Sequence, residues 1–306
     1  MTRELPELVA EHGVPGAQVA ALVDGDVVDA VAGVLNVATG VPVTTDAVFQ
    51  IGSITKVWTA TLVQQLANEG RLDLDRSVRE YLPGFHIADK TASATVRIRQ
   101  LLCHTAGFEG DLFTDTGSND DAVEKCVGTL ADAAQLFPPG DQFSYCNSGY
   151  VVLGRLVEVL QGKPFNTVLR ERLITPLGLE HVATNVAEAI LERPAIGHLQ
   201  VEPLAPVRPA PVWSLAPSNA PAGSMLAMCA RSLLGFVHMH LSDVSFSVMR
   251  QPQVVVPDLG WLRGHWGLGW MLFDYPGGTV IGHDGATLGQ SAYLRVVPAA
   301  GIAIAL

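Results

Sequence analysis

A serine and a lysine lie three residues apart at the start of the apolar segment FQIGSITKVWTATLV. Ser53 and Lys56 share one face if this segment is helical, because three residues span nearly one turn. A serine hydroxyl becomes a nucleophile when a neighbouring base takes its proton, and burial lowers the pKa of a lysine toward that role. The same spacing also fits a helix cap followed by a surface lysine.

A tyrosine and an asparagine, Tyr145 and Asn147, flank Cys146 where a loop leads into a helical pattern. Near a lysine ammonium, the Tyr145 phenol would lose its proton below its usual pKa of about 10 and act as base or acid. Asn147, which is both donor and acceptor, is a candidate to bridge Lys56 and a substrate amide. A packed tyrosine beside an N-cap at Asn147 or Ser148 is the alternative interpretation.

A third group of candidates lies in GHDGA at 282–286, at the end of an expected strand. Its glycines, including Gly285, allow the backbone to approach a ligand closely. The amide of Ala286 is expected to form an oxyanion hole with the amide of Ser53. His283 is a candidate to polarise the substrate or to tune Tyr145, although a lone histidine is more often structural.

The elements that must position these residues are strands at both chain ends and helices between them. Residues 16–36 contain two β-rich runs around Asp24-Gly25-Asp26, which predicts a hairpin. Apolar residues recur at helical spacing from Val57 to Glu69, and Gly70 is placed for a C-cap. A second helical pattern covers 150–162, and apolar runs predict C-terminal strands at 266–273, 278–283, 290–297 and 301–306.

These patterns predict an α/β fold of the α+β type, with one antiparallel sheet formed from both chain termini and flanked by helices. We expect a single catalytic domain over 1–306, with the sheet from about 1–50 and 262–306 and a mostly helical and loop region at about 70–260. Six prolines between Pro203 and Pro221 predict an irregular excursion. Because the sequence stops inside an apolar strand, we also expect a missing C-terminal segment.

The three motifs together resemble, in order and approximate separation, those of the serine β-lactamase-like and penicillin-binding protein superfamily. This group includes class C β-lactamases, serine esterases, D-amino-acid peptidases and penicillin-binding-protein-type thioesterases. Further segments that resemble the family are LLCHTAGF (101–108), PAGSMLAMCARSLLGFVHMHL (221–241) and WGLGW (266–270). The resemblance implies a β-lactamase/transpeptidase-like fold and an acyl-enzyme on Ser53, with Lys56 and Tyr145 as catalytic residues and no cofactor.

The resemblance also directs the choice of function. His283 stands where β-lactamases have a lysine, which is similar to the esterase, D-peptidase and peptide-cyclase branches. We therefore expect a serine hydrolase or acyltransferase that acts on esters, thioesters or amides, with a small-molecule or peptide acyl substrate that includes carrier-bound or thioester peptides. One alternative is a thioesterase that offloads and macrocyclises a nonribosomal peptide. Another is a catalytically inactive binding or sensor module.

Composition excludes several other classes of function. The formal charge is -11, and the basic residues form no runs, which argues against nucleic acid as a partner. Neither a secretory signal nor an apolar run of about 18 residues is present, so we expect a cytoplasmic protein that makes no use of a membrane. The cysteines Cys103, Cys126, Cys146 and Cys229 have no metal-site spacing and are interpreted as reduced, mostly buried thiols.

Other histidines and acidic residues have ordinary interpretations. His238 and His240 diverge on a helix and do not favour a metal site, and none is expected. His104 is interpreted as a buried hydrogen-bonding residue at a helix end. The acidic segment DLFTDTGSNDD at 111–121 is most simply a solvated surface. A position beside the pocket, where it would favour cationic substrates, is the alternative.

Overall fold

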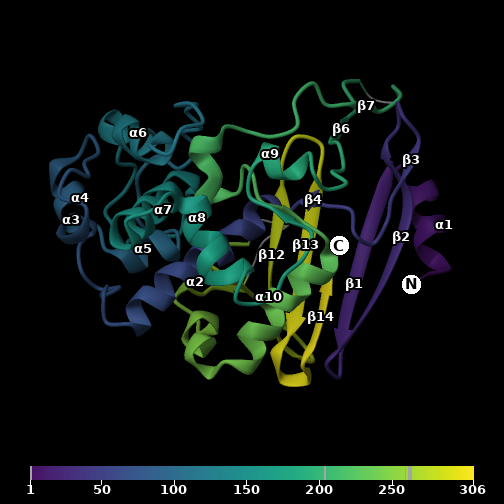
Figure 1. The fold of residues 1–306 in the computed structure, drawn as a ribbon. Coiled ribbons are helices and arrows are strands. Elements are labelled where there is room, and N and C mark those ends of the chain that lie inside the picture. Colours follow the sequence, from purple (N-terminus) through teal and green to yellow (C-terminus); the bar gives the residue numbers. More distant parts are fainter. Residues whose placement is uncertain (1, 203–204, 259, 261–263) are drawn as a thin grey trace.

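The computed structural model describes residues 2–202, 205–258, 260 and 264–306. Within these residues, strands from both chain ends form one nine-stranded antiparallel sheet, in the order β3-β2-β1-β14-β13-β12-β11-β10-β9 (Figure 1). The sheet formed from both termini and flanked by helices confirms the predicted fold class. Its strands are β1 Gly16–Val23, β2 Asp26–Asn36, β3 Val41–Pro42, β9 Val254–Val256, β10 Gly264–Trp266, β11 Met271–Tyr275, β12 Gly278–Ala286, β13 Ser291–Val297 and β14 Ile302–Ala305.

Three expected boundaries were wrong. The chain begins with a helix, α1 (Glu4–Glu11), rather than with the sheet, and β9 joins the sheet before the expected start at 262. The expected strand at 266–273 is two strands, because the chain turns at 267–270, where Gly269 has a φ of 87°. The last strand, β14, lies inside the sheet, paired with β1 on one side and β13 on the other.

The N-terminal hairpin has the predicted turn. Asp24 and Gly25 both have positive φ angles, 52° and 87°, as a two-residue turn between twisted strands requires. Strands β1 and β2 then pair from Gly16 opposite Gly33 to Val23 opposite Asp26. The composition of this segment was sufficient to predict the hairpin, because the turn depends on local backbone preferences.

Helices cover both faces of the sheet and make up the rest of the molecule (Figure 1). In the described residues they are α1, α2 Thr55–Asn68, α3 Val78–Tyr81, α4 Lys90–Thr95, α5 Ile98–Leu102, α6 Ala122–Gly128, α7 Asn147–Gln161, α8 Phe165–Leu169, α9 Val186–Ala189 and α10 Ala230–Ser242. Short turns of 3₁₀ helix include η1 Gly52–Ile54 and η4 Pro217–Ala222. Over the described part of the chain, no helix combines the length and the apolar character needed to cross a bilayer.

Short strands complete the structure. Strands β4 (Phe49–Gln50), β8 (Ala227–Met228) and β5 (Val182–Ala183) form a small second sheet immediately before the Ser53 turn. The proline-rich segment is mostly irregular, as predicted. Its described regular pieces are β7 (Arg208–Pro209), which pairs with β6 (His198–Leu199), and the start of η4. Pro203 lies outside the described residues.

The alternation of side chains along β1 separates two apolar clusters. Val19 packs with Leu5 of α1 on one face, whereas Ala20 belongs to the main core, which includes residues of α10. Helix α2 is buried along most of its length, and Trp58 stacks on Phe236 of α10 with ring centroids 3.9 Å apart. A helix that is buried on most sides gives its first turn a fixed position, and that turn carries Lys56.

Candidate active site

The serine and the lysine of the first motif face one another. Ser53 lies in the 3₁₀ turn η1 and Lys56 in the first turn of α2, with Ser53 Oγ 2.9 Å from Lys56 Nζ. The Lys56 amine also donates a hydrogen bond to the carbonyl oxygen of Ala222, at 2.7 Å. The lysine is therefore held between the serine hydroxyl and one backbone carbonyl.

Burial controls the protonation of Lys56. Its side chain is 0% exposed, and removal from water lowers its pKa from 10.5 to about 7. Cys146 and Asp111 act in the opposite direction, but their effect is smaller than that of burial. At neutral pH a large fraction of Lys56 is therefore the free amine, whose lone pair can accept the Ser53 proton.

Tyr145 is the third member of this group. Its ring lies over the lysine, with Lys56 Nζ 4.9 Å from the ring centroid, and it stacks on His104 at 4.4 Å between centroids. Burial raises the pKa of the Tyr145 phenol well above its usual value, although its hydrogen bond with Ser53 acts to lower it. The expectation of a depressed tyrosine pKa was wrong, because the burial of the phenol outweighs the groups that would lower its pKa.

His104 supports the tyrosine ring by stacking on it. It follows α5 with a φ of 59°, is fully buried, and accepts the backbone N–H of Cys146 at Nδ1 (2.9 Å). This bond joins the 101–108 segment to the residue after Tyr145. The interpretation of His104 as a buried hydrogen-bonding residue agrees with this contact.

Asn147 has a different partner from the one expected. It begins α7, for which the N-cap is Cys146, and its Nδ2 donates to Asp111 Oδ1 at 2.6 Å. No hydrogen bond joins Asn147 to Lys56 within the described residues. The sequence could not distinguish Asp111 from the other acidic residues nearby. What distinguishes it is the contact of its loop with α7, which is a tertiary contact.

The backbone around Ser53 is closely packed on two sides. A Cβ at Gly285 would lie 1.9 Å from Ile51 O, and one at Gly52 would lie 2.5 Å from Ala286 N, so the end of β12 touches the serine turn. Gly223 (φ 117°) approaches the opposite side, where a Cβ would lie 2.3 Å from Gly52 O. These contacts bring the amides of Ser53 and Ala286 together, as the proposed oxyanion hole requires.

Ala222 and Gly223 lie outside the three motifs, and no role was expected of them. Their segment, PAGS, is the start of the stretch 221–241, which stood out only because it resembles the family. Gly223 is needed because of its positive φ and its contact with Gly52, while Ala222 contributes a carbonyl oxygen that any residue would supply. A residue that acts through its backbone leaves no side-chain signal in a sequence.

His283 is fully buried and neutral. Its Nδ1 lies 2.6 Å from the carbonyl oxygen of Asp284, and since a carbonyl only accepts, Nδ1 carries the proton and Nε2 is an acceptor. Nε2 has no partner in the described structure, and burial lowers the pKa of His283 to about 3. Its ring centroid lies 6.4 Å from that of Tyr145. The free nitrogen is therefore an acceptor and would not polarise a substrate carbonyl by donating a hydrogen bond.

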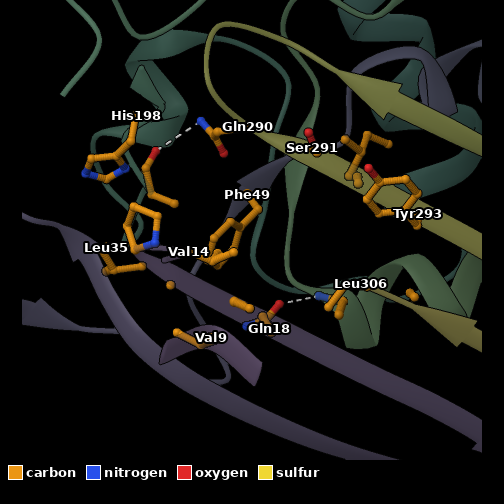
Figure 2. A pocket seen from close by; sticks show the side chains of 18 of the residues that line it. Val9, Val14, Gln18, Leu35, Phe49, His198, Gln290, Ser291, Tyr293 and Leu306 are labelled. Atoms are coloured by element: carbon orange, nitrogen blue, oxygen red, sulfur yellow. Dashed lines mark hydrogen bonds between the residues drawn. The ribbon is translucent and has the colours of Figure 1, made fainter. Parts of the chain in front are cut away.

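The structure also has a separate apolar cavity of about 600 Å³ (Figure 2). It is lined from α1, β1, β13 and the Phe49–Ile51 segment, with Val9, Gln18 and Tyr293 pointing toward it. None of the three motifs contributes a catalytic side chain to its lining. The candidate active site is therefore the cluster around Ser53 and not this cavity.

Comparison with known proteins gives a consistent result. A family model described as Beta-lactamase matches residues 1–306. Penicillin-binding protein 4 of Amycolatopsis lactamdurans is 45% identical over 312 residues, which cover 98% of this chain and 82% of that protein.

Solved structures agree with this result. The crystal structure of SurE superposes with a TM-score of 0.83 and 32% identity, over 99% of this chain and 70% of that chain. A D-stereospecific amidohydrolase from Streptomyces sp. superposes with a TM-score of 0.79 and 27% identity, over 99% and 92%. A class C beta-lactamase has a TM-score of 0.82 at 20% identity, over 98% and 87%, and shares the fold.

Proposed function

The chain belongs to the beta-lactamase family, whose members among its structural neighbours are serine hydrolases, and we propose that it forms an acyl-enzyme on Ser53 as a serine hydrolase or acyltransferase. The observation that carries the proposal is the buried Lys56 amine, 2.9 Å from Ser53 Oγ and with a pKa of about 7. A lysine with its usual pKa would be protonated at neutral pH and unable to act as a base.

In the acylation step, Ser53 Oγ attacks the substrate carbonyl carbon while its proton passes to Lys56 Nζ. The carbonyl oxygen becomes an oxyanion, which the amides of Ser53 and Ala286 stabilise with hydrogen bonds. The Ala222 carbonyl accepts a hydrogen bond from the amine and holds its lone pair toward the serine. The new bond joins Oγ to the carbonyl carbon.

Collapse of this intermediate breaks the bond between the carbonyl carbon and the leaving oxygen, sulfur or nitrogen. Tyr145, whose raised pKa keeps its proton in place, donates that proton to the leaving atom and regains one from the Lys56 ammonium. Water or an amine then attacks the acyl-enzyme and gives its proton to Lys56, and Ser53 leaves with a proton. Attack by water makes the protein a hydrolase, and attack by an amine makes it an acyltransferase.

We propose that the acyl group carries a D-configured residue. The SurE structure was also solved with D-Leu, at 31% identity and a TM-score of 0.78, and the Streptomyces amidohydrolase is described as D-stereospecific. His283 is neutral and therefore supplies no cation for the carboxylate of a β-lactam. Esters, thioesters and amides of D-residues are accordingly the favoured donors. Peptidyl thioesters are included among these donors, because a macrocyclising enzyme would act on a peptide that carries a thioester at one end and a nucleophilic amine elsewhere in the same chain.

A fluorophosphonate probe tests the catalytic proposal directly, because it phosphonylates only an activated serine. Intact mass should show one added label on the native protein and none on the Ser53→Ala variant. A Ser218→Ala variant, which changes a buried serine away from the Lys56 amine, is the matched control and should be labelled normally. A native protein that takes no label would favour the inactive binding or sensor module.

A substrate panel then identifies the branch. It compares a cephalosporin, p-nitrophenyl butyrate, a D-aminoacyl amide and a peptidyl N-acetylcysteamine thioester with a C-terminal D-residue. The cephalosporin belongs in the panel because the curated relative is named for penicillin binding. Efficient cephalosporin turnover without reaction of the ester or thioester would reject the proposed substrate class.

A further inference from the structure

Asp111 holds an exposed carboxylate at the edge of the candidate active site. Its Oδ1 accepts the hydrogen bond from Asn147 Nδ2 at 2.6 Å, and Asn147 begins the same helix that Tyr145 precedes by two residues. The second oxygen, Oδ2, has no hydrogen-bond partner among the described residues. The carboxylate is thus beside the catalytic group with one oxygen available to a ligand.

The position of this carboxylate is fixed by the backbone on both sides of it. Ser148 donates to Gly110 O from its backbone N–H (2.8 Å) and from its hydroxyl (3.0 Å), and Leu112 N donates to Ser148 Oγ at 3.4 Å. Gly110 also lies against the tyrosine segment, because a Cβ there would be 2.7 Å from Tyr145 O. The segment that carries Asp111 is therefore held against the start of α7.

Three of the neighbouring acidic residues have other partners. Asp121 pairs with Lys125 at 2.8 Å, Glu124 pairs with Arg155 at 2.8 Å, and Asp115 Oδ1 accepts the backbone N–H of Gly117. Within the residues that the structure describes, no lysine, arginine or histidine forms an ion pair with Asp111. Its negative charge nevertheless acts on the candidate active site, since it raises the pKa of Lys56 and that of Tyr145.

We propose that Asp111 binds a protonated amine of the substrate, so that preferred acyl donors carry an ammonium group close to the scissile carbonyl. This inference rests on the proposed acyl transfer at Ser53 and specifies its substrate. The ammonium donates to Oδ2 while Asn147 keeps Oδ1, and the free Asn147 amide oxygen can accept a substrate N–H. The formal charge of -11 further favours the approach of cationic substrates over anionic ones.

The test compares two substrates that differ only in this charge. They are the N-acetylcysteamine thioesters of D-phenylalanine, with a free amine, and of N-acetyl-D-phenylalanine. The isosteric Asp111→Asn variant should lower kcat/KM for the free amine by about 10- to 100-fold, because a hydrogen bond between charged groups is lost. For the acetylated substrate the change should stay within about threefold.

Two controls make the result interpretable. The variant Asp115→Asn changes a neighbouring exposed carboxylate and should leave both rates unchanged. Equal melting temperatures of Asp111→Asn and the native protein show that the fold is intact. Added salt should reduce the native preference for the free amine and leave the smaller preference of Asp111→Asn nearly unchanged.

The possible failures are distinct. If Asp111→Asn lowers kcat/KM for both substrates by the same factor, Asp111 acts only through its effect on Lys56, and the inference is wrong. If the native protein turns over both thioesters equally well while the phosphonate labels Ser53, amine recognition is rejected and acyl transfer stands. If neither thioester reacts and the phosphonate does not label Ser53, the proposed function itself is rejected.

Discussion

Lys56 Nζ lies 2.9 Å from Ser53 Oγ, and the lysine is fully buried with only a backbone carbonyl as its second partner. Burial therefore controls whether the serine can be activated. Because the free amine is the reactive form, kcat/KM should rise with pH and level off above a midpoint at about 7. A pH profile with a fluorogenic ester measures that midpoint, and an activity independent of pH from 5.5 to 9 would contradict the assignment of Lys56 as the base.

Replacing Lys56 by arginine makes the positive charge permanent and removes the base, since a guanidinium stays protonated. We expect kcat/KM of the Lys56→Arg variant to fall by about 10²- to 10⁴-fold. The rise of kcat/KM with pH around 7 should also disappear. The exposed Lys163, which pairs with Glu171, provides the matched control Lys163→Arg. Rates for this control should equal those of the native protein, and a similar loss in both variants would show a nonspecific effect.

The depressed pKa of Lys56 also predicts how stability depends on pH. Between about 7 and 10.5 the unfolded chain binds more protons than the folded chain, so the free energy of unfolding rises with pH over this window. Below pH 7 the full cost of burying the amine is present. A Lys56→Met variant should thus be more stable than the native protein at pH 6.5, by roughly 1–3 kcal/mol. This difference in the free energy of unfolding should shrink toward pH 9.5. Urea unfolding at both values measures this, and parallel pH dependences would refute it.

Removing the Tyr145 hydroxyl should affect chemistry and leave packing unchanged. The Tyr145→Phe variant keeps the ring that stacks on His104 but has no proton to give the leaving group. We expect kcat to fall by about 10²- to 10⁴-fold with little change in melting temperature. The exposed Tyr275, changed to phenylalanine, serves as the control. Retention of nearly full activity in Tyr145→Phe would assign leaving-group protonation to Lys56.

The contact between Gly285 and the serine turn predicts a steric effect. In Gly285→Ala the new Cβ would lie 1.9 Å from Ile51 O, which must separate the end of β12 from Ser53. We expect loss of the oxyanion site, a fall in kcat/KM of about 10²-fold or more, and slow phosphonate labelling. Gly277→Ala is the control, because a Cβ at Gly277 meets no atom within 4 Å. Equal labelling rates for the two variants would place the oxyanion elsewhere.

His283 should act as a neutral group at every pH used in the assays. Since its pKa is about 3, the factor by which His283→Ala lowers acyl transfer should be constant from pH 5.5 to 9. We expect a loss of about 10- to 100-fold in kcat/KM, together with a lower melting temperature, because the buried ring is replaced by a cavity. His283→Lys should improve binding of a cephalosporin carboxylate without restoring turnover of the native substrate. A loss in His283→Ala that varies with pH near 6.5 would show that the histidine titrates in the site.

Local patterns in the sequence were sufficient for much of the fold and for the choice of motifs. The positive φ angles at Asp24 and Gly25 follow from the preferences of their own residues, and the helical spacing after Ser53 brings Lys56 to the same face. Local patterns were not sufficient at 266–273. There the apolar residues predicted one strand, but a turn that includes Gly269 divides the segment between two strands.

By itself, the sequence was sufficient to identify the candidate catalytic residues, because Ser53, Lys56 and Tyr145 stand in recognisable local motifs. Their protonation states were decided only by the tertiary structure. Burial by distant segments lowers the pKa of Lys56 to about 7 and keeps Tyr145 protonated, and one carbonyl oxygen makes the free nitrogen of His283 an acceptor. The same applies to Asp111, which a loop packed on α7 brings to Asn147. A pKa or a contact depends on all the atoms that surround a group, and most of those atoms belong to residues far away in the sequence.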